Sequence, residues 1–253
     1  MLKYEAPIQV DSINDCFFYH TIDLPGHGEV AGHWDLRNCV DEYLGHYEFS
    51  GKKALDVGAA SGFLSFEMEK RGADVVSFDI GDGADWNIVP HYQLRNELNE
   101  IKRKSGVSIR QLKKSYWLSH SSLKSRAKAF YGDIYDIPES IGQFDVVLYG
   151  MILTHLRDPF QALYSGARHS KDAVIVTGVF SKTETPQGIF RPAAHKTEVY
   201  DIKGWWYLSV GAVKSMLGVL GFTKVEVFDF NATCVSPGIE GEKPCTTIIA
   251  RRE

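Results

Sequence analysis

A short run between residues 53 and 64 contains the residue types that bind a nucleotide-like ligand. The small residues from Gly58 to Gly62 predict a turn where bulky side chains would block a closely approaching ligand. The apolar residues from Phe63 to Met68 then predict a helix. Asp79 ends the next apolar stretch, and its carboxylate suits ribose hydroxyls. The run therefore predicts a cofactor site above a strand, a turn and a helix N-terminus.

The spacing of the glycines argues against a dinucleotide. The G-x-G-x-x-G fingerprint would need glycines at 58, 60 and 63, but the chain has Gly58, Ala60 and Phe63 there. A pyrophosphate would lose the close approach that the second glycine allows. The alternative to any cofactor is an ordinary packing turn between strand and helix, followed by an incidental acid.

The run resembles the first motif of the class I S-adenosylmethionine-dependent methyltransferases, in which an acid precedes three alternating glycines. Asp56, Gly58 and Gly62 match, and Ala60 replaces the middle glycine with one additional methyl group. The resemblance implies S-adenosylmethionine as cofactor, with its methionine part over the turn and its ribose on Asp79. The cofactor-binding residues that it implies are Asp56, Gly58, Ala59, Ala60, Gly62, Phe63, Asp79, Ile80, Asp133, Ile134 and Gly150.

Later segments follow in the order of the same family. Asp133 matches the acid that accepts from the adenine amino group, although Gly-Asp is also an ordinary turn sequence. An apolar strand over 144–151 leads to His155 and Pro159, similar to the family's His-Leu-x-x-Pro segment. The stretch 173–180 fits the fifth strand. These matches run from residue 53 to 180.

The resemblance implies an α/β fold: a Rossmann-like, seven-stranded sheet whose last strand is antiparallel. We expect one domain over residues 1–253. Its parts are an N-terminal helical lid segment (1–50), a cofactor-binding core (51–180) with a helical insertion after the second strand (about 81–126), and a C-terminal part (181–253). The last part holds a substrate loop, a helix over 209–220 and two strands over 223–230 and 246–251.

Length and composition fit a single soluble domain. The chain has 253 residues, of which 44% are hydrophobic and 24% charged. The N-terminus shows no signal-peptide pattern, and no apolar run approaches the roughly 18–20 residues of a membrane span. The four cysteines are scattered without a C-x-x-C pair, which favours reduced thiols. These features predict a cytoplasmic protein that does not contact a membrane; they leave its oligomeric state open.

Charge is distributed unevenly along the chain. Nine Lys and Arg residues lie between Lys102 and Lys128 without an acid, whereas the whole chain carries a net charge of −4. This stretch favours an anionic acceptor or RNA as partner. A solvated helical face is the simpler interpretation.

Two segments narrow the resemblance. Trp205-Trp206 followed by a helix, and the N-terminal His-x-Ile-x-Leu-Pro-Gly run, are similar to the bacterial tRNA wobble-uridine carboxymethyl/methyl-transferase group. Adjacent tryptophans also pack structurally in many proteins. We therefore infer a shared scaffold more readily than a shared substrate.

Methyl transfer requires alignment of the acceptor, exclusion of water and, for a hydroxyl acceptor, a base. His155, just beyond the fourth strand, is the first candidate base, and His195 is the second; His155 could equally be a pocket-wall residue. Tyr19, Trp34, Arg37 and Trp206 could wall the substrate side, or simply pack. The four N-terminal histidines follow no zinc spacing, so we expect no metal site.

Two function classes follow from these observations. We favour a methyltransferase for a small metabolite or biosynthetic intermediate, with transfer to oxygen. The alternative is a tRNA-modifying methyl- or carboxymethyl-transferase, and a third class is a non-catalytic cofactor-binding protein. The methyl acceptor and any modified form of the cofactor cannot be read from the sequence.

Overall fold

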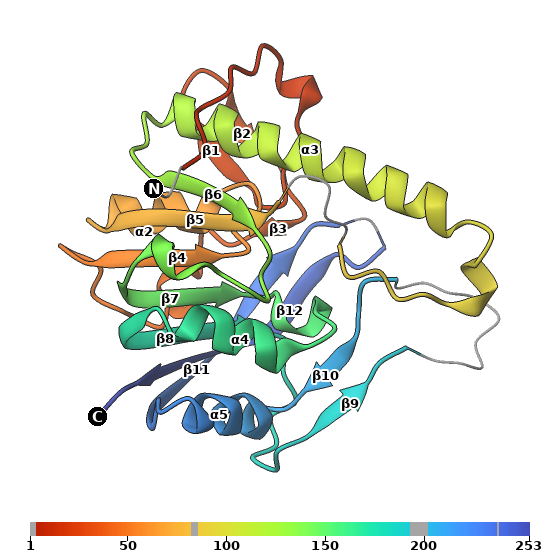
Figure 1. Ribbon diagram of the computed structural model, residues 1–253. Helices are drawn as coiled ribbons and strands as arrows, with labels where there is room; N and C mark the ends of the chain where they lie inside the picture. The colour runs from red at the N-terminus through yellow and green to blue at the C-terminus, as the bar shows by residue number, and fades with distance from the viewer. Residues whose placement is uncertain (1–3, 82–85, 193–201, 237) are drawn as a thin grey trace.

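The structure is a computed structural model that describes residues 4–81, 86–192, 202–236 and 238–253. A twisted sheet lies between two layers of helices (Figure 1). The helices are α1 (Val40–Tyr43), α2 (Phe63–Lys70), α3 (Leu98–Ser122), α4 (Pro159–Ala167) and α5 (Val210–Val219). Short 3-10 turns are η1 (Ile13–Asp15), η2 (Tyr92–Leu94), η3 (Glu139–Ile141) and η4 (Leu153–His155).

Among the described residues the main sheet has eight strands, in the order β3-β11-β12-β8-β7-β4-β5-β6. They are β3 (Trp34–Asp35), β4 (Lys53–Val57), β5 (Asp74–Ile80), β6 (Lys128–Gly132), β7 (Phe144–Gly150), β8 (Ser170–Gly178), β11 (Lys224–Cys234) and β12 (Gly241–Arg251). The five strands from β4 to β8 are parallel, and β12 is antiparallel to both β8 and β11. Two small hairpins lie outside it: β1 (Ile22–Leu24) with β2 (Gly28–Val30), and β9 (Gly188–Phe190) with β10 (Trp206–Leu208).

The mixed α/β sheet with its antiparallel last strand confirms the expected fold class, but the count of seven strands was wrong. The eighth strand is β3, which comes from the N-terminal segment and pairs with β11 through Trp34–Cys234 and Asp35–Thr233. A two-residue edge strand carries no alternation of apolar and polar residues, so the sequence gives no signal for it.

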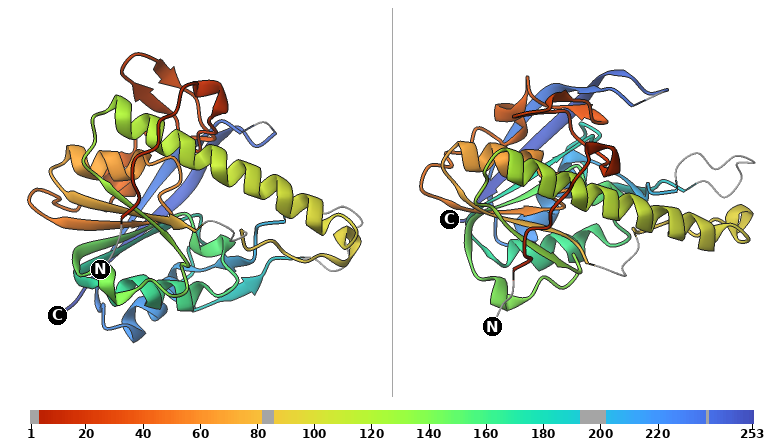
Figure 2. Two further views of the ribbon diagram at one scale, coloured as in Figure 1. Left: turned by 45° about the horizontal axis from the view of Figure 1, so that its top comes forward. Right: turned by 90° about the horizontal axis from the view of Figure 1, so that it is seen from above.

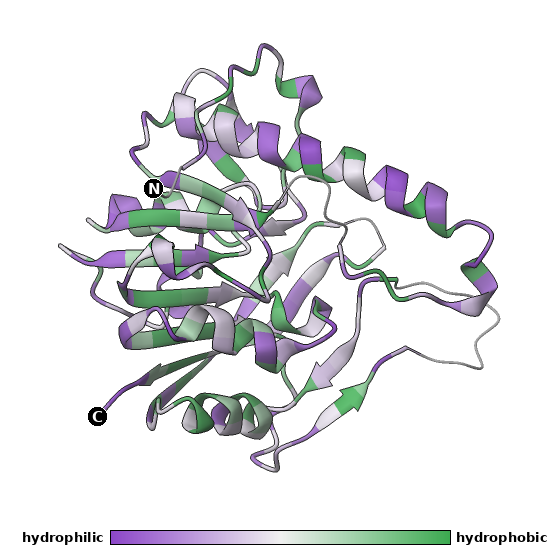
Figure 3. Cartoon of the chain, in the orientation of Figure 1, coloured by the Kyte–Doolittle hydropathy of each residue, from purple (hydrophilic) through white to green (hydrophobic). Residues whose placement is uncertain are grey.

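Central strands are apolar on both faces because helices cover both sides of the sheet. Figure 3 shows the resulting apolar colour along the central strands. One apolar cluster joins the sheet to α2, α3 and the N-terminal segment, and the other joins it to α4 and α5. Helix ends follow local signals: Asp158 caps α4 ahead of Pro159, and Ser209 caps α5 by accepting from the Ala212 N–H.

The expected insertion after the second strand contains a single 25-residue helix, α3. Its carboxyl-terminal half packs against the sheet, while its amino-terminal half extends beyond the carboxyl edge of the parallel strands (Figures 1 and 2). The β9–β10 hairpin extends past the same edge of the sheet. Among its described residues the N-terminal segment contains one turn of α-helix, α1, and the 3-10 turn η1, so the segment expected to be helical over 1–50 is mostly irregular.

Candidate functional site

The turn between β4 and α2 adopts a backbone that favours small residues. Gly58 and Gly62 have φ angles of 85° and 88°, in the left-handed region. A Cβ atom on Gly58 would lie 2.5 Å from Cδ1 of Ile152. Ala60 also has a positive φ, 52°, which costs about 1 kcal/mol for a residue with a Cβ. The motif position where alanine replaces glycine is therefore a strained one.

The carboxylate of Asp79 ties this turn to the end of β5. It accepts hydrogen bonds from the backbone N–H groups of Ala60 and Ile80, both at 2.6 Å. Partial burial raises the pKa of Asp79, whereas the two N–H donors and the nearby Lys113 ammonium favour its ionised form. An acid in this position holds the turn and presents a carboxylate to a ligand above it.

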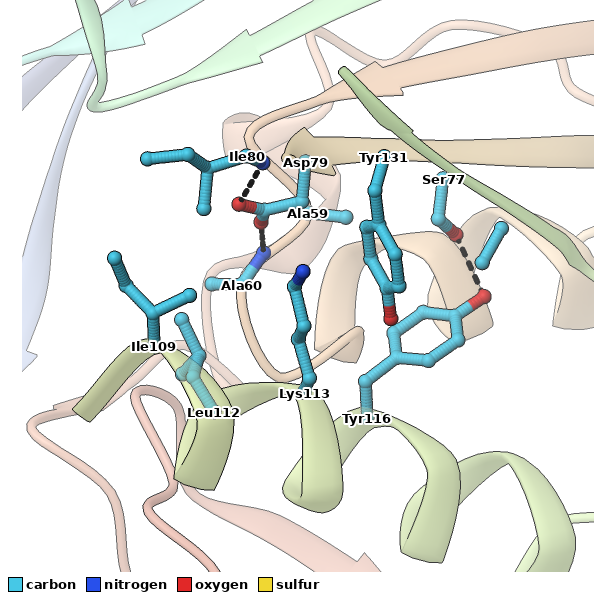
Figure 4. A pocket seen from close by; sticks show the side chains of 11 residues that line it. Ala59, Ala60, Ser77, Asp79, Ile80, Ile109, Leu112, Lys113, Tyr116 and Tyr131 are labelled. Carbon is cyan, nitrogen blue, oxygen red and sulfur yellow. Dashed lines mark hydrogen bonds between the residues drawn. The ribbon is translucent and has the colours of Figure 1, made fainter. Parts of the chain in front are cut away.

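A cavity lies directly beside Asp79, between the sheet edge and α3 (Figure 4). The space between these elements amounts to about 290 Å³ when the open solvent at its mouth is included, so the enclosed part is much smaller than a ligand. The turn contributes Ala59 and Ala60. The sheet contributes Ser77, Asp79, Ile80, Ala129 and Tyr131, and α3 contributes Ile109, Leu112, Lys113 and Tyr116. Apolar walls around one carboxylate suit a flat heterocycle joined to a hydroxylated sugar.

Asp56 lies beneath the turn and does not line this cavity. Its side chain is buried and accepts a 2.6 Å hydrogen bond from the Ser65 hydroxyl. Ser77 donates to Ser65 at 2.7 Å, and Tyr116 donates to Ser77 at 2.9 Å. Burial raises the pKa of Asp56 to about 7, and the Ser65 hydroxyl partly offsets this. These contacts indicate that Asp56 stabilises the turn from below.

Asp133 and Ile134 begin the chain that leaves β6. The pairing of β5 with β6 sets Gly132 beside Ile80, so Asp133 starts at the same sheet edge as Asp79. Its exposed carboxylate accepts from the Tyr135 N–H at 2.9 Å, as in a simple turn, and does not line the cavity. Ile134 packs against the apolar cluster under α4 and α5.

Gly150 ends β7 beside the start of the turn. Val57 of β4 pairs with Tyr149 of β7, so the residues that follow them, Gly58 and Gly150, lie side by side at the carboxyl edge of the sheet. A Cβ on Gly150 would lie 2.9 Å from the Tyr43 hydroxyl, so the glycine leaves room for that side chain. Met151 has a φ of 52°, a strained backbone of the kind that concentrates at functional sites.

His155 ends η4, on the rim beyond β7. Its Nδ1 lies 3.1 Å from the Lys203 carbonyl oxygen, which can only accept, so Nδ1 carries a proton. Trp206 lies in β10, where its indole N–H donates to the Arg157 carbonyl oxygen at 3.1 Å. His195, the second candidate base, lies outside the described residues.

The N-terminal segment contacts the turn through its backbone. The N–H groups of Tyr19 and His20 point to the Ser61 hydroxyl oxygen at 3.3 and 3.4 Å. Trp34 lies in β3 and bridges to His20. The structure therefore brings Tyr19 and Trp34, two predicted substrate-side residues, near the turn.

Arg37 is occupied by acids on the N-terminal segment. Its guanidinium bonds Asp35 at 2.6 and 2.9 Å, Asp23 at 3.0 Å and Glu29 at 2.9 Å. These partners raise its pKa and join the β1–β2 hairpin to β3. The side chain borders a hollow beside α2, away from the cavity at Asp79.

Several cavity residues were missed by sequence reasoning. Lys113 belongs to the basic stretch, but its ammonium lies 3.9 Å from the ring centroid of Tyr131, inside the site. Tyr131 directly precedes Gly132 and Asp133, yet only the acid was singled out. The helical spacing of Ile109, Leu112, Lys113 and Tyr116 could have indicated a shared face, because they lie three or four residues apart.

The chain is similar in sequence to ubiquinone biosynthesis O-methyltransferases. It is 30% identical to the enzyme of Acinetobacter baylyi and 33% to that of Pseudomonas fluorescens, each over 122 residues. These matches cover 48% of this chain and 40% of each relative, so less than half of the relatives' length is spanned. No family model matches the chain.

Solved structures match over most of the chain. The N-terminal domain of EvdMO1 with S-adenosylhomocysteine bound has a TM-score of 0.53, at 15% identity, over 85% of this chain and 81% of that one. Magnesium protoporphyrin IX methyltransferase of Synechocystis gives 0.52 at 14% identity (86% and 78%), and an S-adenosylmethionine-dependent methyltransferase of Methanosarcina mazei gives 0.51 at 13% (83% and 95%). The chain has the methyltransferase fold.

No group of three or more His, Cys, Asp or Glu side chains in the described ranges is arranged to hold a metal ion. Of the helices in those ranges, none combines the length and the apolar character needed to span a bilayer.

Proposed function

We propose that the protein is an S-adenosylmethionine-dependent methyltransferase that acts on a small-molecule acceptor, with transfer to oxygen. The observation that carries the proposal is the Asp79 carboxylate, bonded to the Gly58–Gly62 turn and exposed to an apolar cavity. The fold is shared with a magnesium protoporphyrin IX methyltransferase crystallised with this cofactor and with its product, which supports the same conclusion.

The residues present fit such a cofactor. Asp79 is a hydrogen-bond acceptor for ribose hydroxyls, and Ile80, Ile109 and Leu112 supply apolar contact for a purine. When bound, the sulfonium supplies an electrophilic methyl group that already carries its leaving group. The protein's own task is then to align the acceptor and keep water out.

His155 is the proposed base for a hydroxyl acceptor. The Nδ1 contact with the Lys203 carbonyl oxygen orients the ring, and Nε2 is the nitrogen proposed to take the acceptor's proton. The relatives named for ubiquinone biosynthesis are O-methyltransferases, which supports oxygen as the acceptor atom. His195 remains the second candidate.

The N-terminal segment and the amino-terminal half of α3 are proposed to cover the site, within a single domain. Tyr19, Trp34 and Trp206 are proposed to wall the acceptor side, and the cytoplasm is the proposed location. The bonds from Tyr19 and His20 to Ser61 support a covering role for the N-terminal segment.

RNA modification is the second candidate, supported by the basic residues along α3 and the similarity to the wobble-uridine group. Several of these residues have acidic partners: Arg103 bonds Glu100, Lys114 bonds Asp15 and Arg126 pairs with Glu69. Such pairing favours a solvated face or a small anionic acceptor over extended phosphate contact. A gel shift with bulk tRNA across salt concentrations distinguishes these candidates.

Cofactor binding tests the main proposal. Calorimetry should show S-adenosylhomocysteine binding with one site per chain, in preference to NAD. Asp79→Ala removes the ribose acceptor and should weaken binding by about 1.5–3 kcal/mol, the range for a hydrogen bond to a charged group. Asp133→Ala is the matched control: if the Asp133 carboxylate only accepts the hydrogen bond from Tyr135, the variant should bind S-adenosylhomocysteine as wild type does. Weaker binding in Asp133→Ala would indicate that Asp133 contacts the adenine. Unchanged binding in Asp79→Ala would contradict the proposal.

A further inference from the structure

Two buried polar side chains of the N-terminal segment each have one atom without a hydrogen-bond partner among the described residues. Tyr43 is fully buried and His20 is 6% exposed. Within the described part of the chain, neither the Tyr43 hydroxyl nor Nδ1 of His20 has a partner. A buried polar atom without a partner costs about 1–3 kcal/mol, so each needs an explanation.

Tyr43 is held so that its hydroxyl reaches the carboxyl end of β7. Its backbone oxygen accepts from the hydroxyls of Thr177 (2.8 Å) and Thr247 (3.2 Å), which anchors it on the sheet. The hydroxyl then lies 2.9 Å from the position that a Cβ on Gly150 would take. Leu64, in the first turn of α2, borders the same position at 3.0 Å.

His20 approaches the same helix start from the other flank of the turn. Its N–H points to Ser61, and its ring centroid lies 5.8 Å from that of Phe63, the first residue of α2. Burial and the neighbouring His33 lower the pKa of His20 to about 3, so the imidazole is neutral. A neutral ring nitrogen accepts a hydrogen bond from a cation, whereas a phenol donates one to an anion.

The location is the switch point of the sheet. The order β8-β7-β4-β5 places β4 between β5 and β7, and the chain direction around the sheet reverses between β4 and β7. Ligands of open α/β sheets bind outside the carboxyl ends of the strands at this point. Gly58 and Gly150 border it, and Asp79 lies one strand further along.

We propose that the Tyr43 hydroxyl and Nδ1 of His20 bind the amino-acid end of the methyl donor, the hydroxyl donating to its carboxylate and the imidazole accepting from its ammonium. This inference rests on the proposed function. It assigns to the N-terminal segment a direct part in cofactor binding and explains why both atoms lack protein partners.

Two nucleosides that differ at this end test the assignment. S-Adenosylhomocysteine has the amino-acid group, and 5′-methylthioadenosine lacks it. In calorimetry, Tyr43→Phe should weaken S-adenosylhomocysteine binding about 10- to 100-fold, corresponding to one hydrogen bond to a charged group, and should leave 5′-methylthioadenosine binding unchanged. His20→Phe, which keeps a ring of similar shape, should show the same selectivity.

Equal S-adenosylhomocysteine affinity in Tyr43→Phe and wild type would overturn the inference, as would an equal loss for both nucleosides. Binding of neither nucleoside to the wild type would instead refute the proposed function itself.

Thermal melting of the ligand-free protein gives a readout independent of binding. Tyr43→Phe removes an unsatisfied hydroxyl, so its Tm should be unchanged or about 2–4 °C higher. Tyr149→Phe is the matched control. The buried Tyr149 hydroxyl of β7 donates to α4, where the Ala162 and Leu163 carbonyl oxygens lie 3.0 and 3.1 Å away. That variant should melt lower and bind both nucleosides as wild type does. A fall in Tm for Tyr43→Phe like that of Tyr149→Phe would show a structural hydroxyl and contradict the assignment.

Discussion

Individual side chains at the carboxyl edge have separate tasks that their types alone do not reveal. Asp56 and Asp79 both belong to the motif, yet the first is buried beneath the turn with Ser65 and the second faces the cavity. The hydrogen-bond partners explain the difference. A chain of hydrogen-bonded hydroxyl groups ends on the Asp56 carboxylate, whereas two backbone N–H groups orient the Asp79 carboxylate. Substitutions at the two positions should therefore affect different properties.

His155 should affect turnover more than binding. If Nε2 accepts the acceptor's proton, His155→Ala should lower kcat by about 10²–10⁴-fold with nearly unchanged S-adenosylhomocysteine affinity. Steady-state kinetics, after a screen for acceptors by mass spectrometry, measures kcat, and calorimetry measures the affinity.

His27→Ala is the control, because His27 is exposed in the β1–β2 turn. A modest loss in His155→Ala that appears mainly in the acceptor KM would assign His155 to the pocket wall instead.

Helix α3 and the N-terminal segment bring residues from outside the sheet to its carboxyl edge. The first half of α3 lies beyond the carboxyl edge, and Ile109, Leu112 and Lys113 from the middle of the helix line the cavity beside Asp79 (Figures 2 and 4). The N-terminal segment reaches the same turn through Ser61. The enclosed space beside Asp79 is much smaller than a nucleoside, so we expect α3 or the side chains that line the cavity to shift when a ligand binds.

Ligand binding should therefore protect these elements. We expect limited proteolysis to cut near 102–114, or within the first 40 residues, more slowly when S-adenosylhomocysteine is present. Mass spectrometry of the fragments over time gives the two rates. Cleavage within the exposed β11–β12 turn serves as the internal control and should not change. Equal rates at 102–114 with and without ligand would contradict a covering role for α3.

At the scale of the whole molecule, buried Asp56 and buried His20 have opposite effects on how the free energy of unfolding changes with pH. Asp56 has a folded pKa of about 7 against 3.8 when unfolded, so its contribution to stability is lost as pH rises from about 4 to 7. His20 has a folded pKa of about 3 against 6.5, so the unfolded chain binds its proton first and stability rises over nearly the same range. The two slopes largely cancel in the wild type.

Asp56→Asn should expose the slope of His20. Asparagine can still accept from Ser65 but does not titrate, so the free energy of unfolding should rise with pH from 4 to 6.5. The slope should approach 1.4 kcal/mol per pH unit. Urea unfolding at several pH values measures it, with Asp133→Asn as an exposed control. A variant profile identical to that of wild type would show that Asp56 is not protonated in the folded protein at mid pH.

The sequence by itself determined the parts of the fold and site that depend on local pattern. Apolar runs located β4, β5, β7 and β8, and Pro159 and Ser209 located the starts of α4 and α5. The acid–glycine motif located the turn, because its left-handed backbone demands small residues at Gly58 and Gly62.

Only the tertiary structure decided which distant residues share the site. The covering position of α3, the placement of Lys113 beside Tyr131, the edge strand β3 and the approach of Tyr43 to Gly150 join segments far apart in the chain. Such contacts leave no periodic signal in either segment, since each depends on how helices pack onto a sheet already formed. For the same reason Arg37, chosen by residue type, lies among Asp23, Glu29 and Asp35 and away from the cavity.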